Sequence, residues 1–254
     1  MDPVIEALAT QHAELRDVLE SLAAARWHVP TRCEGWDVAD VVTHLAQSDE
    51  MAIASAQGKF VESLRERSEG IEVDSQVVSV DEAVALMVAS ESGAPVETLR
   101  ERWVATAGHL VEVLDGIDLS VRVEWVTGVI SARSLATTRL AETWIHGGDI
   151  TSALGIASRP NDGLRHIARL AWRTLPYAFQ TAGRSMSGPI AFRLTAPSGE
   201  TWEFSPEQPA VTTVSGPALE LCEVAGRRVP AGETALVAHG PDAEAVLELV
   251  RTYA

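Results

Sequence analysis

Two side chains four residues apart in the segment TRLAETWIHGGDI have the types and the spacing of metal ligands. In a helix, Glu142 and His146 leave the same face about one turn from each other. Asp149 extends the same line toward the end of the segment. A carboxylate and an imidazole at this spacing can bind one divalent ion, and a third ligand from a facing helix would leave positions open to water or substrate.

A second segment, TRCEGWDVADVVTHLAQ, supplies a candidate for the third ligand. His44 lies one turn into the helix expected there, on or beside its buried face. Buried charged groups need a partner or a metal, which favours grouping His44 with Glu142 and His146. His12 lies in an apolar stripe and competes as a ligand, but we predict that it lines the substrate pocket. Asp149 is predicted to accept the second N–H of His146 or to act catalytically on a bound water.

Other catalytic motifs are missing from the sequence. It contains no GxSxG, P-loop, HExxH or GxGxxG pattern, which argues against a metal-free hydrolase or a nucleotide enzyme. The two cysteines, Cys33 and Cys222, match no CxxC spacing, so we predict two reduced thiols and neither a disulfide framework nor a thiolate zinc site.

Composition bounds the class of protein. The chain has 254 residues, of which 46% are hydrophobic, enough for a buried core. Its formal net charge of −16 repels phosphate backbones and anionic membranes, so nucleic acid is not an expected partner. No apolar run approaches the roughly 20 residues that cross a bilayer, and the N-terminus lacks the features of a signal peptide. We therefore expect a cytoplasmic protein with no membrane contact.

The candidate ligands fall within four segments whose apolar residues recur at three- and four-residue steps, which predicts four long helices. These run from about 5 to 26, from 38 into the region of 60, from 96 to 114, and from 132 to 154. Asp37 and Ser131 suit N-cap positions. Ser79 and Glu82 form a capping box before a shorter helix. The stretch DLSVRVEWVTGV, which precedes the last long helix, is predicted to have irregular structure.

After the four long helices, the sequence pattern predicts strands as well as helices. Asp162 opens another helix that ends near Gly183, and IAFRLTA with ETWEFS predicts a β-hairpin. A strand in AVTTVS, a helix in PALELCEVA, a strand in ALVAH and a last helix over 241–253 follow. The predicted fold is mainly α: a metal-binding four-helix bundle over residues 1–155, then a connecting helix and a small α+β C-terminal domain over residues 156–254.

The segments TRCEGWDVADVVTHL and RLAETWIHGGDI, with a tail containing ELCEVAGRR, resemble the mycothiol-dependent maleylpyruvate isomerase family of the DinB-like metal-binding superfamily. The resemblance covers the whole chain, strongly at the first two segments and loosely in the tail. It implies a DinB-like four-helix bundle with a small C-terminal α+β domain. It also implies a metal, usually zinc, bound by His44, Glu142 and His146.

The resemblance further implies a thiol chemistry. Family members use mycothiol as a cosubstrate, either to isomerise a cis double bond by reversible thiol addition or to transfer the thiol to an electrophile. Zinc would bind this thiol as a thiolate. Arg227 matches the family's contact to the substrate carboxylate, and the adjacent Arg228 could fill the same role. The expected partners are a small-molecule substrate and the thiol, and the chain is expected to be a monomer or a homodimer.

Two alternatives stay open at this point. The protein could be a non-catalytic metal- or small-ligand-binding protein, in which case a fourth protein ligand is expected in place of an open coordination position. It could also be an enzyme of iron(II) or another divalent metal, since two histidines and one carboxylate suit iron(II) as well as zinc.

Overall fold

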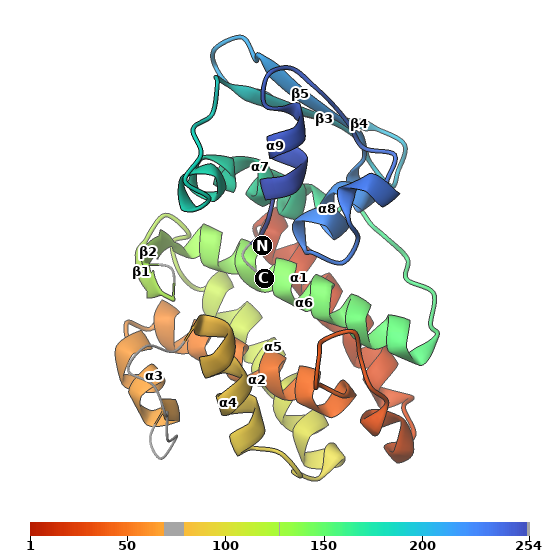
Figure 1. Cartoon of the computed structure of the whole chain (residues 1–254). Helices are drawn as coiled ribbons and strands as arrows, with labels where there is room; N and C mark the ends of the chain where they lie inside the picture. Colours follow the sequence, from red (N-terminus) through yellow and green to blue (C-terminus); the bar gives the residue numbers. More distant parts are fainter. Residues whose placement is uncertain (69–78, 127, 253–254) are drawn as a thin grey trace. The chain divides into compact units, whose positions relative to one another are not determined.

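The computed structural model describes residues 1–68, 79–126 and 128–252, and it divides the chain into two compact units, Met1–Ser158 and Arg159–Ala254 (Figure 1). The first unit is helical apart from one hairpin, and the second contains a four-stranded sheet with three α-helices. The predicted fold class, mainly α with a small α+β unit at the C-terminal end, is confirmed. Among the described residues, no helix is both long enough and apolar enough to cross a membrane.

Four long helices form the bundle of the first unit (Figure 1). They are α1 (Pro3–Glu20), α2 (Val38–Ala56), α5 (Val96–Asp115) and α6 (Ala132–Leu154). Both α1 and α2 pack against α5 and α6, so the four helices close into a ring around one apolar core. Core residues from three of these helices include Leu15, Leu19, Val41, Leu45, Trp103 and Ala107.

Side-chain caps fix where the two helices that carry the candidate ligands begin. The Asp37 carboxylate accepts from the amide of Asp40 at 3.0 Å, and the Asp40 carboxylate accepts from the amide of Asp37 at 3.1 Å. The Ser131 hydroxyl accepts from the amide of Ser134 at 3.1 Å and caps α6. Both predicted helix starts are confirmed, and they set the phase of the helix faces that carry the candidate ligands.

Several predicted helix ends were wrong. The first helix stops at Glu20, and a separate 3₁₀ turn, η1 (Ala24–His28), follows it. The second stops at Ala56, because Gly58 adopts a left-handed conformation at φ +74° that a helix cannot contain. A separate short helix, α3 (Phe60–Ser68), begins after this break. The Ser79 capping box opens α4 (Val80–Ser90), as predicted.

The stretch expected to be irregular before α6 contains an antiparallel hairpin of β1 (Arg122–Trp125) and β2 (Gly128–Ser131). The Ser55 hydroxyl of α2 donates to the carbonyl of Glu124, and the rings of Phe60 and Trp125 lie 5.6 Å apart. These contacts hold the hairpin against α2 and α3. Strands of four residues are too short for alternation to reveal them in the sequence.

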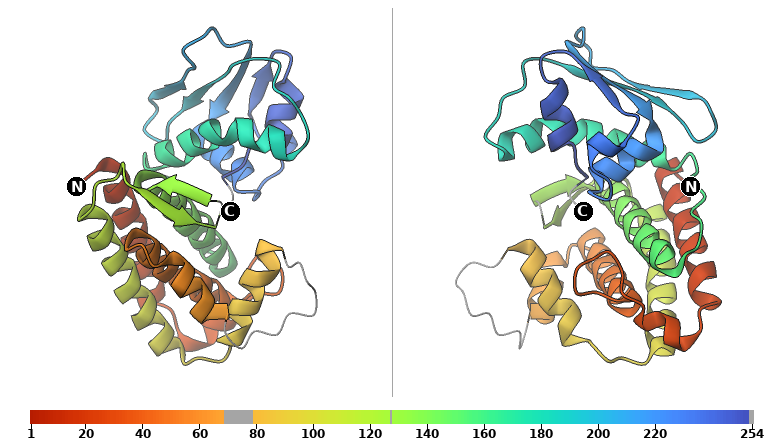
Figure 2. Two further views of the ribbon diagram at one scale, coloured as in Figure 1. Left: turned by 90° about the vertical axis from the view of Figure 1, so that its left-hand side faces the viewer. Right: turned by 45° about the vertical axis from the view of Figure 1, so that its right-hand side comes forward.

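The second unit is built on a four-stranded sheet (Figure 2). The order of its strands is β4-β3-β5-β6. Its strands are β3 (Ile190–Thr195), β4 (Thr201–Phe204), β5 (Thr212–Pro217) and β6 (Val237–His239). Its helices are α7 (Leu164–Thr181), α8 (Ala218–Ala225), the 3₁₀ turn η2 (Ala231–Glu233) and α9 (Ala243–Leu249). The predicted hairpin of β3 and β4 is confirmed, whereas the last helix is shorter than predicted. Alternate β3 residues are buried, so one face of the sheet covers the core.

A buried ion pair joins α2 to α6. The Nε of Arg139 donates to Asp49 Oδ1 at 2.9 Å, and its Nη2 donates to Ser48 Oγ at 3.0 Å. Arg139 and Asp49 are almost completely buried. A charge this deep in the protein is tolerated only with a partner, so the pair fixes how the two helices lie against each other.

Replacing Asp49 with Ala should lower the free energy of unfolding by about 3–5 kcal/mol, because Arg139 would keep a buried charge without its carboxylate. Urea unfolding followed by far-ultraviolet circular dichroism measures this change. The matched control is Asp17→Ala, which removes the exposed pair with Arg16 and should cost less than about 1 kcal/mol. Equal losses in the two variants would show that the buried pair does not hold the bundle together.

Candidate metal centre

Three candidate ligands from two helices converge in the first unit. His44 on α2 and Glu142 on α6 are separated by 98 residues, yet His44 Nε2 lies 3.3 Å from Glu142 Oε2. His146 Nε2, one turn further along α6, lies 3.6 Å from the same carboxylate oxygen. The ligand atoms of all three residues lie within 4.8 Å of one another. The structure thus brings together the set of residues that the sequence predicted.

The separations of the two imidazole nitrogens from Glu142 Oε2, 3.3 Å and 3.6 Å, are close to those of one tetrahedral ion. Zinc binds imidazole nitrogen and carboxylate oxygen at about 2.0–2.2 Å, which places neighbouring ligand atoms about 3.3–3.5 Å apart in a tetrahedral site. The side chains of His44, Glu142 and His146 are 12%, 15% and 10% exposed, so the group is sheltered but reachable. The group has three protein donors within the part of the chain that the structure describes, the number typical of catalytic zinc sites.

Burial and hydrogen bonding set the charges of the group. Burial alone raises the pKa of the Glu142 carboxyl group, but hydrogen bonds from His146 and His44 outweigh it and hold that pKa well below its usual range. Burial lowers the pKa of His44. Burial also acts to lower the pKa of His146, but interactions with Asp149, Cys33 and Glu142 raise it well above its usual value. These interactions favour an ionised carboxylate beside a protonated imidazole, and a cation could take the place of that proton.

Asp149 orients His146. Its Oδ2 lies 3.1 Å from His146 Nδ1, and Asp149 is buried. With Nδ1 held in this way, Nε2 is the nitrogen that faces Glu142, the arrangement common among metal-bound histidines. The Nε of Arg32 lies 3.5 Å from Asp149 Oδ1 and supports the carboxylate from the other side.

The loop before α2 adds two residues that sequence reasoning did not place at the site. The ring centroid of Trp36 lies 5.3 Å from that of His44 and 6.5 Å from that of His146. The Cys33 sulfur lies 3.2 Å from Asp149 Oδ2 and 3.8 Å from His146 Nδ1. Both residues belong to the segment TRCEGW, but spacing rules do not reach into a loop. The prediction that the cysteine spacing indicates no thiolate zinc site stays a prediction, although the Cys33 sulfur is a potential donor.

His12 lies apart from the candidate ligand group. It is buried in α1, where its Nε2 is 3.4 Å from Thr143 Oγ1 and 3.8 Å from Asp49 Oδ2. Its ring meets the ring of Trp103 edge-on. Burial lowers the pKa of this imidazole. The structure thus places His12 in the bundle core beside the buried ion pair, while its predicted contact with substrate stays a prediction.

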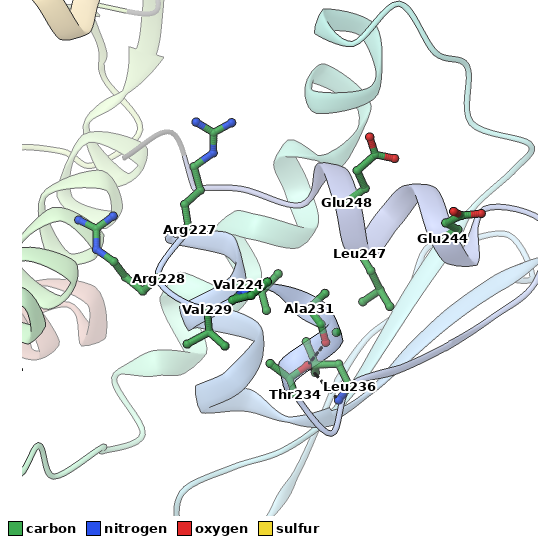
Figure 3. A pocket seen from close by; sticks show the side chains of 12 residues that line it. Val224, Arg227, Arg228, Val229, Ala231, Thr234, Leu236, Glu244, Leu247 and Glu248 are labelled. Carbon is green, nitrogen blue, oxygen red and sulfur yellow. Dashed lines mark hydrogen bonds between the residues drawn. The ribbon is translucent and has the colours of Figure 1, made fainter. Parts of the chain in front are cut away.

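Arg227 and Arg228 lie in the C-terminal unit, just after α8 (Figure 3). They border a cavity of about 850 Å³ whose lining includes Val224, Leu236 and Leu247. Arg227 is exposed and has φ +59°, a left-handed conformation that glycine usually supplies after a helix end. The Arg228 guanidinium donates to the carbonyl of Gly226 at 2.8 Å.

Comparison with known proteins identifies the class. The family profile of the mycothiol maleylpyruvate isomerase N-terminal domain matches residues 8–151, which contain all three candidate ligands. An uncharacterised protein of Mycobacterium tuberculosis, matched in the strains CDC 1551 / Oshkosh and ATCC 25618 / H37Rv, is 31% identical over 255 residues, covering 99% of this chain and 95% of its own. The chain belongs to the mycothiol maleylpyruvate isomerase family.

Solved structures agree with this assignment at the level of the fold. Crystal structures of the mycothiol-dependent maleylpyruvate isomerase and of a histidine-to-alanine mutant of it match with TM-scores of 0.59 and 0.58. Each match covers 96% of both chains at 17% sequence identity. The two-unit architecture is therefore shared with that enzyme.

Single Ala substitutions of His44, Glu142 and His146 should each remove most of the bound metal, because each side chain would supply one of three protein ligands. Asp149→Ala should weaken metal binding by about ten- to a hundredfold, since it only orients a ligand. Metal content of the purified variants, measured by mass spectrometry, checks both expectations. His109→Ala, which changes an exposed histidine on α5, should leave metal content unchanged.

His12→Ala separates the two histidines that compete for the third position. It should retain the metal that His44→Ala loses. The reverse pattern, with metal kept in His44→Ala and lost in His12→Ala, would contradict the assignment of His44.

Proposed function

We propose that the protein is a zinc-dependent enzyme of the mycothiol-dependent isomerase and S-transferase type, which activates a thiol for addition to a small electrophilic substrate. The observation that carries this proposal is the convergence of His44, Glu142 and His146 at separations suited to one tetrahedral ion. Three protein donors leave one coordination position for a thiol. Membership of the mycothiol maleylpyruvate isomerase family supports mycothiol as that thiol.

The side chains around this position have distinct tasks. When bound, zinc lowers the pKa of a coordinated thiol and keeps its sulfur as a nucleophilic thiolate. His44 and His146 offer their Nε2 atoms and Glu142 its Oε2. Asp149 holds the Nδ1–H of His146, which leaves the lone pair of Nε2 for the ion. Trp36 lies against both imidazole rings and keeps water from that side of the group.

The choice of zinc over iron follows from the cosubstrate. Two histidines and one glutamate suit either ion. Zinc is borderline-soft and has no redox chemistry, so it can bind a thiolate without oxidising it. A thiol-transfer or thiol-addition reaction therefore favours zinc.

Arg227 is the proposed contact to a substrate or thiol carboxylate. Within the described part of the chain, its guanidinium makes no hydrogen bond or ion pair, whereas that of Arg228 already donates to Gly226. A guanidinium binds a carboxylate through two parallel N–H donors. Arg227 is therefore the better candidate for capturing an anionic group.

Chelation should remove zinc and reduce the rate of thiol transfer to background, while far-ultraviolet circular dichroism changes little, because the apolar core of the bundle does not depend on the ion. The rate is measured with mycothiol and a bimane electrophile, and with mycothiol and maleylpyruvate for isomerisation. One equivalent of zinc should restore it. Unfolding of the helices on chelation would make the ion structural and contradict the proposal.

Replacing Arg227 with Lys should raise KM for an anionic substrate by about tenfold, because lysine keeps the charge but loses the bidentate geometry. Thermal stability should change little, since Arg227 is exposed. The matched control is Arg228→Lys, measured in the same assay. A larger effect in Arg228→Lys would move the carboxylate contact to that residue, and no effect in either would remove it from this loop.

A further inference from the structure

A second set of potential metal donors lies beside the first. Cys33 from the loop before α2 meets His146 and Asp149 of α6. The separations are 3.2 Å from the Cys33 sulfur to Asp149 Oδ2, 3.8 Å from that sulfur to His146 Nδ1, and 3.1 Å from Nδ1 to Oδ2. His146 and Asp149 are more than nine-tenths buried, and Cys33 is half-buried, which leaves a route for an ion.

These separations are close to those of a tetrahedral site. Zinc–sulfur bonds of about 2.3 Å, with nitrogen and oxygen ligands at about 2.0–2.2 Å, imply ligand atoms about 3.3–3.6 Å apart. The three observed distances bracket that range. An ion could therefore be bound after shifts of a few tenths of an ångström.

The donor types define the class of ion. A thiolate together with an imidazole selects soft or borderline-soft cations, such as Cd²⁺ and Zn²⁺, over Mg²⁺ and Ca²⁺, which prefer oxygen ligands. We propose that Cys33, His146 and Asp149 form a second cation site for a soft divalent ion, and that this site shares His146 with the first group. The first group uses Nε2 of the shared ring, and the second uses Nδ1.

Sharing one imidazole couples the two sites. Binding at the second site releases the proton of the Cys33 thiol and the proton that His146 Nδ1 shares with Asp149, and both protons pass to solvent. Asp149 then binds the ion and no longer orients the ring by a hydrogen bond. An ion at the second site would therefore be held by the same imidazole ring that the first group would use.

Charge balance permits both sites to be filled. Two divalent cations would face the carboxylates of Glu142 and Asp149, the thiolate of Cys33 and the imidazolate of His146, so that four positive charges meet four negative ones. The nearby Arg32 opposes a further cation, but its side chain is 41% exposed and bound to Ser152, so solvent and salt weaken its effect.

The test is a Cd²⁺ titration that records the ultraviolet thiolate-to-metal charge-transfer absorption. Zinc-loaded wild-type protein should gain one thiolate-bound Cd²⁺ per chain. Cys33→Ser should lose this absorption while keeping its zinc, and Asp149→Asn should weaken Cd²⁺ binding by about tenfold or more. Cys222→Ala is the matched control and should titrate as wild type, because burial raises the pKa of the Cys222 thiol and hinders its ionisation.

His44→Ala distinguishes a second site from a fourth ligand of the first. It removes a ligand from the first group only, so the absorption should persist in this variant. Three results would overturn the proposal: no absorption in the wild type, absorption that survives Cys33→Ser, or absorption that disappears in folded His44→Ala. The proposal does not rest on the thiol chemistry above, because the titration records binding of Cd²⁺ to Cys33 and needs no mycothiol or substrate.

Discussion

The contact between α2 and α6 is the constraint on which the candidate metal centre depends. Arg139 lies one turn before Glu142 on α6, and its partners Ser48 and Asp49 lie about one turn after His44 on α2. The Ser48 hydroxyl also donates to the carbonyl of His44 at 2.6 Å. A slip of one helix by a single turn, about 5.4 Å, would break the ion pair. The same slip would also move His44 away from Glu142 and His146. The buried pair therefore sets the register in which the ligands meet.

The same pairing changes how the acidic residues near the site should be understood. The sequence around His44 is rich in carboxylates, and the chain has a formal charge of −16. In the structure, Asp49 is bound to Arg139, while Glu50 is bound to Arg102 and Arg67. These carboxylates stabilise the bundle and are balanced by their partners. The electrostatic repulsion of an anionic substrate in this region is therefore weaker than the count of acidic residues suggests.

Local sequence rules predicted the parts of the site that lie on regular helices. The caps at Asp37 and Ser131 fixed the helix starts, and the four-residue step from Glu142 to His146 placed both side chains on one face. The position of His44 followed from the helical pattern together with the family resemblance. The bundle that joins these segments was predicted from four apolar periodicities.

Features that depend on tertiary contacts were not predictable in this way. The turn that brings Cys33 and Trp36 to the histidines contains Gly35 at φ +79°, and it is closed by a hydrogen bond from the amide of Thr31 to the carbonyl of Trp36. Periodicity has no signal for such a loop. The parallel pairing of β3 with β5 also escaped prediction, because the partner strand follows only after the intervening β4.

X-ray absorption at the zinc edge, recorded on protein with one equivalent of zinc before and after addition of mycothiol, tests the central claim most directly. We expect a shell of nitrogen and oxygen ligands at about 2.0–2.2 Å, joined after thiol addition by one sulfur at about 2.3 Å. A shell that thiol leaves unchanged would contradict the proposed site. So would a sulfur ligand present before any thiol is added, because Cys33 would then bind the ion assigned to His44, Glu142 and His146.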